Sequence, residues 1–423
     1  MKITKIETIW FEALPDAVWR KQNPTARQAL PNNLWVRVYT EDGLVGLGET
    51  YYLPRAVSAV IHDVFATLLI GREALDIENH WHNMFSLVNF CGYAGAEIRA
   101  ISALDVALWD LAGQYFNQPI YNALGGRSRE QVPIYNTAVG YGKYADYNAW
   151  TEGRAGQLAS ELLAQGITAL KIWPFDQFGT TLAGPANPRG KVTIWGQETA
   201  AGVLAHGIRD DDLKKGVSIL EDIRKAVGDK MAVAIEGHCR WDLPSAIRIA
   251  QALKPYNILW LEEIMPPDNV EAYVRLKATT SLPICQSERL FTRFAFRPFI
   301  EKNAADIIMP DLSWCGGLTE TRKICSLADT YYLPITTHDT IGPVALWAAA
   351  HLMVHIPNAF MMETVRGYVD GWYDEVVTER ITIKNGMLSL GRKPGLGIKL
   401  REDFTSRPGA QVEITDEAKL QSR

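Results

Sequence analysis

The chain contains Ala234-Ile235-Glu236, Trp260-Leu261-Glu262 and Gln286-Ser287-Glu288, three strand-like stretches that each end on a glutamate. Both intervals between these glutamates are 26 residues long. That interval is the length of one strand, one helix and two short loops, which is the repeat of a parallel βα barrel. Glutamates at the carboxyl ends of three successive barrel strands would lie on one rim. The sequence therefore predicts three converging carboxylates.

These three carboxylates predict a metal site. Like charges cannot share one spot unless a cation lies between them. A single glutamate at a strand end is usually a solvated surface group, but three in register indicate a divalent ion bound by Glu236, Glu262 and Glu288. Oxygen ligands favour Mg²⁺, with Mn²⁺ as the alternative, over zinc. Strand alternation points Glu263 away from the barrel interior, so Glu262 is the expected ligand.

The chain from Val132 onward alternates between strand and helix patterns. We expect eight strands to end near Asn136, Lys171, Glu236, Glu262, Glu288, Asp311, His338 and Glu363. Eight βα-sized steps favour a closed TIM barrel over an open doubly wound sheet. A Gly-x-Gly-x-x-Gly turn after an early strand is also missing, which argues against dinucleotide binding.

The first part of the chain has a different pattern. Residues 34–39 and 44–49 read as two strands joined by a turn around Asp42-Gly43, and Glu97 to Ala112 has helical spacing. We therefore expect an α+β domain over residues 1–130 and a barrel over 131–365. The segment 366–423 is expected to pack back on the first domain.

Composition excludes several classes of protein. A net charge of −5 gives no electrostatic footprint for nucleic acid, and the scattered Lys and Arg give none for a membrane. The start has no apolar signal segment, and no apolar run approaches the ~20 residues of a membrane-spanning helix. Five cysteines with no zinc or redox spacing predict buried thiols in a reducing cytoplasm. They are Cys91, Cys239, Cys285, Cys315 and Cys325.

One interval, from Lys171 to Glu236, is far longer than the others. It contains a stretch rich in Gly, Pro and Thr from Asp176 to Gly216. A long loop inside a compact barrel is usually functional, so we expect this one to cover the site. A surface insertion without function is the alternative.

The remaining strand ends carry acid–base groups. Asp311 and His338 on adjacent strands can form a hydrogen-bonded pair in which the carboxylate fixes the imidazole tautomer. His238 lies two residues past Glu236, on the same face. Lys171 and Glu363 complete a ring of charged groups around the predicted metal.

Together these residues resemble the enolase superfamily, mandelate racemase subgroup. The motifs that carry the resemblance are Lys171-x-Trp173, Glu236, Glu262-Glu263, Ser287-Glu288-Arg289, Pro310-Asp311, Gly316-Gly317, His338 and Glu363. The resemblance implies an α+β capping domain over a modified (β/α)7β barrel. It also implies Mg²⁺ and removal of the proton α to a carboxylate, which gives an enediolate.

One motif departs from the subgroup. Its racemases carry Lys-x-Lys on the second strand, whereas this chain reads Lys171-Ile172-Trp173. Trp173 cannot accept a proton, so two-base racemisation loses one base. Glu236-Gly237-His238 is similar to the Asp-x-His of sugar-acid dehydratases in the subgroup, where the histidine protonates the leaving hydroxyl.

The leading hypothesis is therefore a sugar-acid dehydratase. His338 would remove the α-proton, Lys171 would hold the enediolate and His238 would help the β-hydroxyl to leave, giving a 2-keto-3-deoxy acid. Because three glutamates outweigh one Mg²⁺, Glu363 helps only if protonated, and we predict a raised pKa for it in the substrate complex. The alternatives are an epimerase, racemase or cycloisomerase, and a weakly catalytic member with a binding or regulatory role.

Recognition of a small acid sugar is expected to come from the capping-domain loops and from Trp173. Trp173 points inward two residues from Lys171, so its bulk would shape the pocket. The further candidates for substrate binding are Trp19, Asn33 and Tyr51. Barrel enzymes of this kind commonly form symmetric assemblies, so by analogy we expect a homo-oligomer.

Overall fold

The computed structural model describes residues 1–12, 32–178 and 204–422. It also describes four two-residue strands between 179 and 203, which are β6 (Thr180–Thr181), β7 (Gly184–Pro185), β8 (Thr193–Ile194) and β9 (Gln197–Glu198). Trp19 lies outside the described residues, and so does part of the stretch from Asp176 to Gly216 that was predicted to cover the site.

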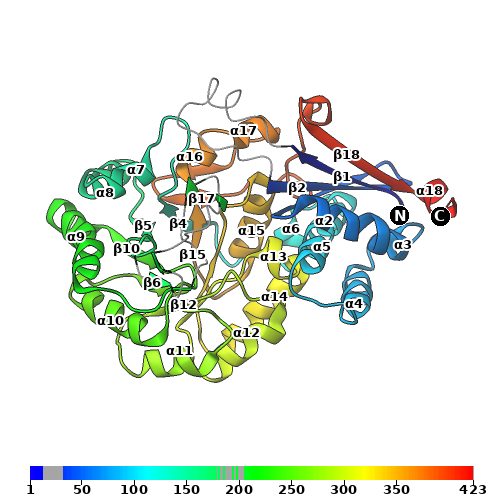
Figure 1. Cartoon of the computed structure of the whole chain (residues 1–423). Helices are drawn as coiled ribbons and strands as arrows, with labels where there is room; N and C mark the ends of the chain where they lie inside the picture. Colours follow the sequence, from blue (N-terminus) through cyan, green and yellow to red (C-terminus); the bar gives the residue numbers. More distant parts are fainter. Residues whose placement is uncertain are drawn as a thin grey trace.

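Eight parallel strands form a closed barrel (Figure 1). They are β4 (Gln131–Thr137), β5 (Ala169–Ile172), β10 (Ala232–Glu236), β11 (Trp260–Glu262), β12 (Ile284–Gln286), β13 (Ile307–Ile308), β14 (Ile335–Thr337) and β15 (Ala359–Thr364). Neighbours in the sequence pair with each other, and β15 pairs with β4 to close the ring. The predicted barrel is confirmed.

Helices surround the barrel (Figure 1). The longer ones are α8 (Ala155–Ala164), α9 (Asp210–Val227), α10 (Leu243–Leu253), α11 (Val270–Lys277), α12 (Thr292–Glu301), α14 (Gly317–Asp329) and α15 (Pro343–His355). Short helices are α7 (Asp146–Thr151), α13 (Leu312–Cys315), α16 (Arg366–Val369) and α17 (Tyr373–Val376). The sequence of α10 explains why this segment forms a helix that packs on the barrel, because Ala246, Ile249 and Leu253 fall on one buried face. Asp242 caps its first turn by accepting a hydrogen bond from the Ser245 amide.

The N-terminal domain is an antiparallel sheet covered by helices. Its strands, in spatial order, are β18 (Ala410–Asp416), β1 (Ile3–Phe11), β2 (Asn33–Thr40) and β3 (Val45–Tyr51). The helical segments are α2 (Pro54–Ala59), the π-helical η2 (Val60–Phe65), α3 (Ala66–Leu69), α4 (Ile77–Val88), α5 (Ala96–Tyr115) and α6 (Ile120–Ala123). The predicted hairpin is β2–β3, and the predicted helix is α5.

The close contact between α5 and β3 depends on two glycines. A Cβ on Gly46 would lie 2.1 Å from the Ala107 carbonyl oxygen, and one on Gly48 would lie 1.9 Å from that of Ala103. Any larger residue at either position would push the helix off the sheet. α5 also contacts α13 and α14 of the barrel.

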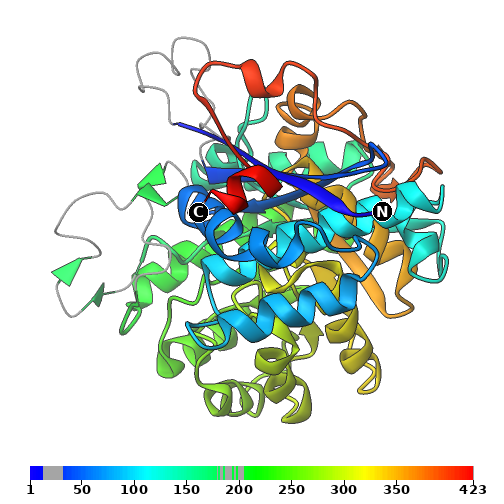
Figure 2. The same ribbon diagram turned by 90° about the vertical axis from the view of Figure 1, so that its right-hand side faces the viewer.

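The last strand of the chain completes the N-terminal sheet. β18 pairs with β1 in antiparallel register from Lys5↔Asp416 to Phe11↔Ala410. Figure 2 shows β18, in red, running beside the blue β1. Earlier in this C-terminal segment, the hairpin β16 (Thr382–Lys384) and β17 (Met387–Ser389) extends the barrel sheet at the start of β4.

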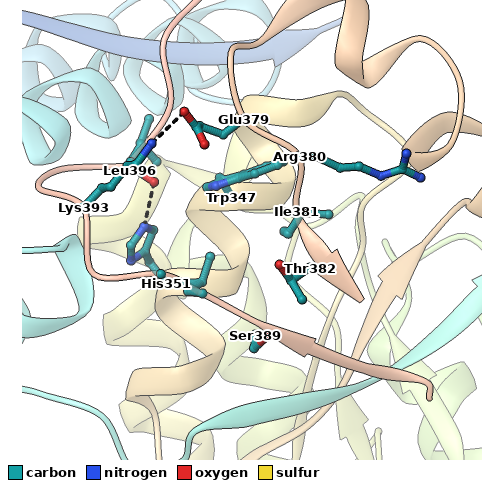
Figure 3. Close-up of a pocket in the computed structure, with 12 residues that line it drawn as sticks. Trp347, His351, Glu379, Arg380, Ile381, Thr382, Ser389, Lys393 and Leu396 are labelled. Carbon is teal, nitrogen blue, oxygen red and sulfur yellow. Dashed lines mark hydrogen bonds and ion pairs between the residues drawn. The ribbon is translucent and has the colours of Figure 1, made fainter. Parts of the chain in front are cut away.

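A cavity of about 190 Å³ lies between α15 and the C-terminal segment (Figure 3). His351 lies at its wall, fully buried, and joins three parts of the chain. Its Nδ1 accepts a hydrogen bond from the Tyr121 amide at 3.3 Å, and its Nε2 donates to the Leu396 carbonyl at 3.1 Å. Lys393 and Glu379 form an ion pair at the rim. The neutral imidazole therefore uses both of its nitrogens.

Because of His351, we expect the free energy of unfolding to depend on pH. Burial lowers the pKa of His351 to about 4, whereas an unfolded histidine titrates near 6.5. Its contribution is therefore present above pH 6.5 and is lost as pH falls toward 4, because the unfolded chain takes up the proton first. We expect the free energy of unfolding to drop by about 2 kcal/mol from this group between pH 7 and pH 5.

Urea unfolding at the two pH values checks this expectation. The variant His351→Gln should show a smaller drop than the unaltered protein. His82→Gln, which changes an exposed histidine on α4, should keep the full drop. Equal drops in all three proteins would contradict the assignment.

All five cysteines are free, and four of them are buried. The prediction of a buried thiol is wrong for Cys91, which is exposed because it lies in the loop between α4 and α5. Among the residues that the structure describes, none of the helices combines the length and the apolar character needed to cross a membrane.

Candidate active site

The carboxylates of Glu236, Glu262 and Glu288 meet at one end of the barrel. Glu236 and Glu262 are the last residues of β10 and β11 and are paired in register, while Glu288 follows β12 by two residues. One oxygen from each lies within 4.8 Å of the other two, and all three side chains are buried. Burial raises the pKa of all three groups, to about 7 for Glu236.

This group fits a divalent cation. Among the described residues, Glu236 Oε2 and Glu288 Oε2 are buried without a hydrogen-bond partner. Buried carboxylate oxygens without donors are costly unless a positive charge lies against them. An all-oxygen set of this kind suits a hard cation. The group can therefore hold a metal ion, and the sequence pattern alone located it.

Lys171, near the end of β5, borders the triad. Its Nζ lies 2.6 Å from Glu262 Oε1, 2.9 Å from Glu363 Oε1 and 3.5 Å from Glu236 Oε2. Burial opposes the charge of this ammonium, but the carboxylates of Glu262 and Glu363 raise the pKa of Lys171 well above its ordinary value. The side chain is a fixed cation beside the metal group.

His338 follows β14 directly and lies on the other side of the triad. Its Nδ1 donates to Asp311 Oδ2 at 2.7 Å, and Asp311 Oδ1 accepts from the Ser313 amide. Its Nε2 lies 3.2 Å from Glu288 Oε2. Burial disfavours the imidazolium, but the carboxylates of Glu288, Glu363 and Asp311 raise the pKa of His338 to about 10. A cation bound by Glu288 would oppose this rise.

Glu363, on β15, lies between Lys171 and His338. It accepts hydrogen bonds from the Thr137 hydroxyl and from the Asp339 amide. Burial raises the pKa of Glu363, but the charges of Lys171 and His338 outweigh burial and lower it to about 2. This is the opposite direction from the one predicted for the substrate complex, because the two cations stabilise the ionised form.

A second Asp–His pair lies at the Glu236 side of the triad. The amide of His238 donates to Glu236 Oε1 at 2.6 Å, and its Nδ1 is hydrogen-bonded to Asp176 Oδ2. His238 has φ of +45°, a left-handed turn that folds it back toward β10. Sequence reasoning missed Asp176, because it was assigned to the start of the long loop. Its place five residues after Lys171 was the available signal.

Trp173, Tyr51 and Asn33 are the remaining described residues that were predicted to bind the substrate. The ring of Trp173 lies 5.7 Å from that of His238 and also contacts Tyr147 and Trp150. Tyr51 lies at the end of β3, and its carbonyl accepts a hydrogen bond from Arg99. Asn33 is fully buried, and its amide nitrogen donates hydrogen bonds to Glu49 Oε1 and to the Ile341 carbonyl.

Glu263 is also buried, away from the triad. It accepts hydrogen bonds from Cys239, Ser287 and Arg289. The Arg289 guanidinium and these donors offset burial and lower the pKa of Glu263. Its hydrogen bonds go to these three side chains, and its negative charge contributes to the raised pKa of Glu236 and of Glu288.

Two aromatic contacts near His338 were not predicted. Trp314, on α13, has its ring 5.0 Å from the imidazole. The Arg99 guanidinium of α5 lies 4.2 Å above the Trp314 ring. An N-terminal-domain cation therefore lies close to the Asp311–His338 pair.

Family comparisons agree with this geometry. The model of the mandelate racemase / muconate lactonizing enzyme N-terminal domain matches residues 22–125, and that of the enolase C-terminal domain-like fold matches 154–404. The chain belongs to the mandelate racemase/muconate lactonizing enzyme family of the enolase superfamily. It is an enzyme, as the sequence motifs predicted.

Similar proteins with known names cover most of the chain. The D-xylonate dehydratase of Haloferax volcanii is 32% identical over 369 residues, which are 87% of this chain and 83% of the relative. The D-galactonate dehydratase of Pectobacterium atrosepticum is 31% identical over 96% of this chain and 93% of its own. An enolase of the mandelate racemase subgroup from Agrobacterium tumefaciens has a solved structure with a TM-score of 0.82. It is 37% identical and aligns over 99% of this chain and 100% of that one.

Proposed function

We propose that this chain is a Mg²⁺-dependent dehydratase of a sugar acid. It removes the proton α to the carboxylate and eliminates the β-hydroxyl as water, giving a 2-keto-3-deoxy acid. The observation that carries the proposal is the pair of imidazoles, one on each side of the triad and each bonded to an aspartate. A dehydratase needs both a base and an acid. The dehydratase activities of the two relatives from Haloferax volcanii and Pectobacterium atrosepticum support the same reaction class.

His338 is the proposed base. Asp311 holds Nδ1–H, so the free electron pair of the neutral imidazole is at Nε2, which faces the triad. Abstraction breaks the Cα–H bond and leaves its electron pair on the substrate as an enediolate. The proton moves to His338 Nε2.

The charge that develops on the substrate carboxylate needs compensation, which is the larger part of the catalysis. Glu236, Glu262 and Glu288 would hold the Mg²⁺ ion, which supplies positive charge beside that carboxylate when it is bound. The Lys171 ammonium lies against the same group and provides a second, permanent positive charge.

His238 is the proposed acid. Asp176 binds its Nδ1, which leaves Nε2 to donate a proton to the β-hydroxyl. The enediolate electrons then form the Cα–Cβ double bond as the Cβ–O bond breaks and water leaves. The enol product tautomerises to the keto acid.

A screen of aldonic and aldaric acids with added Mg²⁺ tests the proposal, with keto-acid formation as the readout. At least one acid should give a 2-keto-3-deoxy product with loss of water. Failure across a library that covers the common stereoisomers would reject the dehydratase function.

The second candidate is epimerisation at the α-carbon. It is favoured by His238 as a second proton-transfer group on the other side of the triad. A reaction in D₂O separates the two functions. Epimerisation puts deuterium on the α-carbon with all hydroxyls retained, whereas dehydration forms a keto acid.

Asp176→Ala tests the acid. Without the carboxylate the His238 ring loses its fixed tautomer, so we expect water loss to slow by about 10²-fold. Exchange of the α-proton with solvent, which depends on His338, should continue. Proton NMR in D₂O measures both rates on the same sample.

The matched control is Asp211→Ala, which removes an exposed carboxylate at the start of α9. It should leave both rates unchanged. Equal slowing of exchange and water loss in Asp176→Ala would argue against separate roles for the two histidines.

We also propose that the chain acts in the cytoplasm as a homo-oligomer with an acid sugar as its substrate. The free cysteines support a reducing compartment. The proposed domain limits are 1–130 and 131–365, with 366–423 packed on the first domain. The pairing of β18 with β1 supports this packing for the last strand, whereas the β16–β17 hairpin of the same segment pairs with β4 of the barrel.

A further inference from the structure

Two barrel helices begin on glycines close to the proposed base. α14 has Gly316 at its N-cap and follows Asp311 by one short helix, and α15 has Gly342 at its N-cap and follows His338 by four residues. A glycine has no side chain with which to accept hydrogen bonds from the first amides of a helix. These amides need acceptors from elsewhere in the molecule.

The N-terminal domain supplies the acceptor for α15. Glu49, on β3, is buried, and its Oε2 accepts a hydrogen bond from the Ala345 amide at 2.9 Å. The contact requires a glycine at 342, because a Cβ there would lie 2.1 Å from Glu49 Oε1. Burial raises the pKa of Glu49 to about 8, and its Oε2 can accept this hydrogen bond in either charge state.

The same arrangement occurs at α14. Asp105, on α5, is fully buried, and its Oδ2 accepts from the Thr319 amide at 2.9 Å. A Cβ on Gly317 would lie 2.4 Å from that oxygen. Two N-terminal-domain carboxylates thus cap the two helices that follow the two halves of the Asp311–His338 pair.

Further polar contacts hold the segments between the pair and the helices. The Asn33 amide nitrogen donates to Glu49 Oε1 at 3.2 Å and to the Ile341 carbonyl at 3.0 Å. Ser102 Oγ accepts from the Gly316 amide, and Thr50 Oγ1 donates to the Ser313 carbonyl. Each segment is therefore fixed to the N-terminal domain at more than one point.

We propose that Glu49 and Asp105 are positioning residues, which cap α15 and α14 across the domain interface and so hold His338 and Asp311 in catalytic alignment. The inference rests on the proposed function only in taking His338 as the base. A base displaced by about 1 Å can lose roughly 10²-fold in rate, so small shifts of either helix matter.

The chain offers a matched control in Asp110. It is a buried carboxylate on α5, like Asp105, and it also accepts from backbone amides, those of Leu47 at 2.9 Å and Leu396 at 2.7 Å. Neither amide belongs to a barrel helix. Loss of Asp110 therefore removes comparable bonds but takes no acceptor from the first turn of α14 or α15.

The kinetic test compares Glu49→Ala, Asp105→Ala and Asp110→Ala in the full-length, Mg²⁺-loaded protein. All three should lose thermal stability. Only the first two should lower kcat and α-proton exchange, by about 10- to 100-fold with KM little changed. Glu49→Gln and Asp105→Asn keep an acceptor oxygen and should recover most of the loss.

A second readout does not need a substrate. In protein labelled with ¹⁵N-histidine, the Nδ1–H resonance of His338 reports its bond to Asp311 and is assigned by its absence in His338→Asn. It should shift or broaden in Glu49→Ala and Asp105→Ala and stay unchanged in Asp110→Ala. If an alanine variant does not fold, Glu49→Gln and Asp105→Asn should show the smaller shift.

The outcomes separate the two proposals. If no acid sugar is dehydrated, the dehydratase function fails and the NMR arm alone decides the positioning role. An unchanged His338 resonance in the Glu49 and Asp105 variants would overturn the inference. So would an equal change in Asp110→Ala.

Discussion

Replacing His338 with asparagine is expected to lower kcat by about 10²–10⁴-fold, the contribution of a placed general base. The asparagine amide can still donate to Asp311, so the local fold should persist. It has no basic nitrogen, so exchange of the substrate α-proton with D₂O should disappear. Stopped assays of keto-acid formation and proton NMR of the recovered substrate measure the two effects.

His82→Asn is the control for this experiment, because it alters an exposed histidine on α4. It should retain full turnover and full exchange. Persistent α-proton exchange in His338→Asn would remove His338 from the base role. His238, at the other side of the triad, would then be the candidate base.

Removal of the divalent ion is expected to abolish turnover, with a loss of about 10³-fold or more. The buried carboxylates of Glu236, Glu262 and Glu288 then have no cation between them, and the substrate carboxylate would add another negative charge. Chelation followed by dialysis, with kcat measured before and after addition of Mg²⁺ or Mn²⁺, gives the size of the effect.

The variant Glu262→Gln should lose Mn²⁺ binding measured by calorimetry, because it removes one of the three ligands. Glu263→Gln is the control, since this neighbour is equally buried but bonds to Arg289 instead. It should still bind Mn²⁺. Turnover that survives exhaustive chelation would show that the triad does not serve a metal in catalysis.

The barrel could be predicted from sequence because its signal is periodic. Each strand and helix repeat places a chemically distinctive residue at a strand end, and the 26-residue interval recurs without any knowledge of distant contacts. The three glutamates converge because β10, β11 and β12 pair in chain order. Their meeting point thus follows from local pattern alone.

Contacts between distant segments gave no such signal. Asp176 meets His238 because a turn after β5 brings it across to the end of β10, and their separation in sequence is 62 residues. Asn33 was predicted to bind substrate, and no sequence pattern indicated that its amide nitrogen donates to Glu49 and to the Ile341 carbonyl. Neither contact is accompanied by a periodic pattern in the sequence.

The same reason explains the unpredicted edge of the N-terminal sheet. β1 forms its outer pair with β18, which is almost the whole chain away. The sequence predicted that residues 366–423 pack on the first domain, but the pattern could not identify β18 as the strand that pairs with β1. The partner depends on how the finished barrel directs the last segment.

The β1–β18 pair has a consequence for the nascent protein. On the ribosome, β1 emerges long before β18, the strand that covers its edge. At ~5–20 residues per second, that edge stays open for roughly 20–80 s. An open strand edge invites pairing with other chains, so molecules still being translated on the same messenger are the ones most exposed to mispairing. Stalling of translation between β15 and β18 should therefore yield aggregates, although all eight barrel strands have already been made.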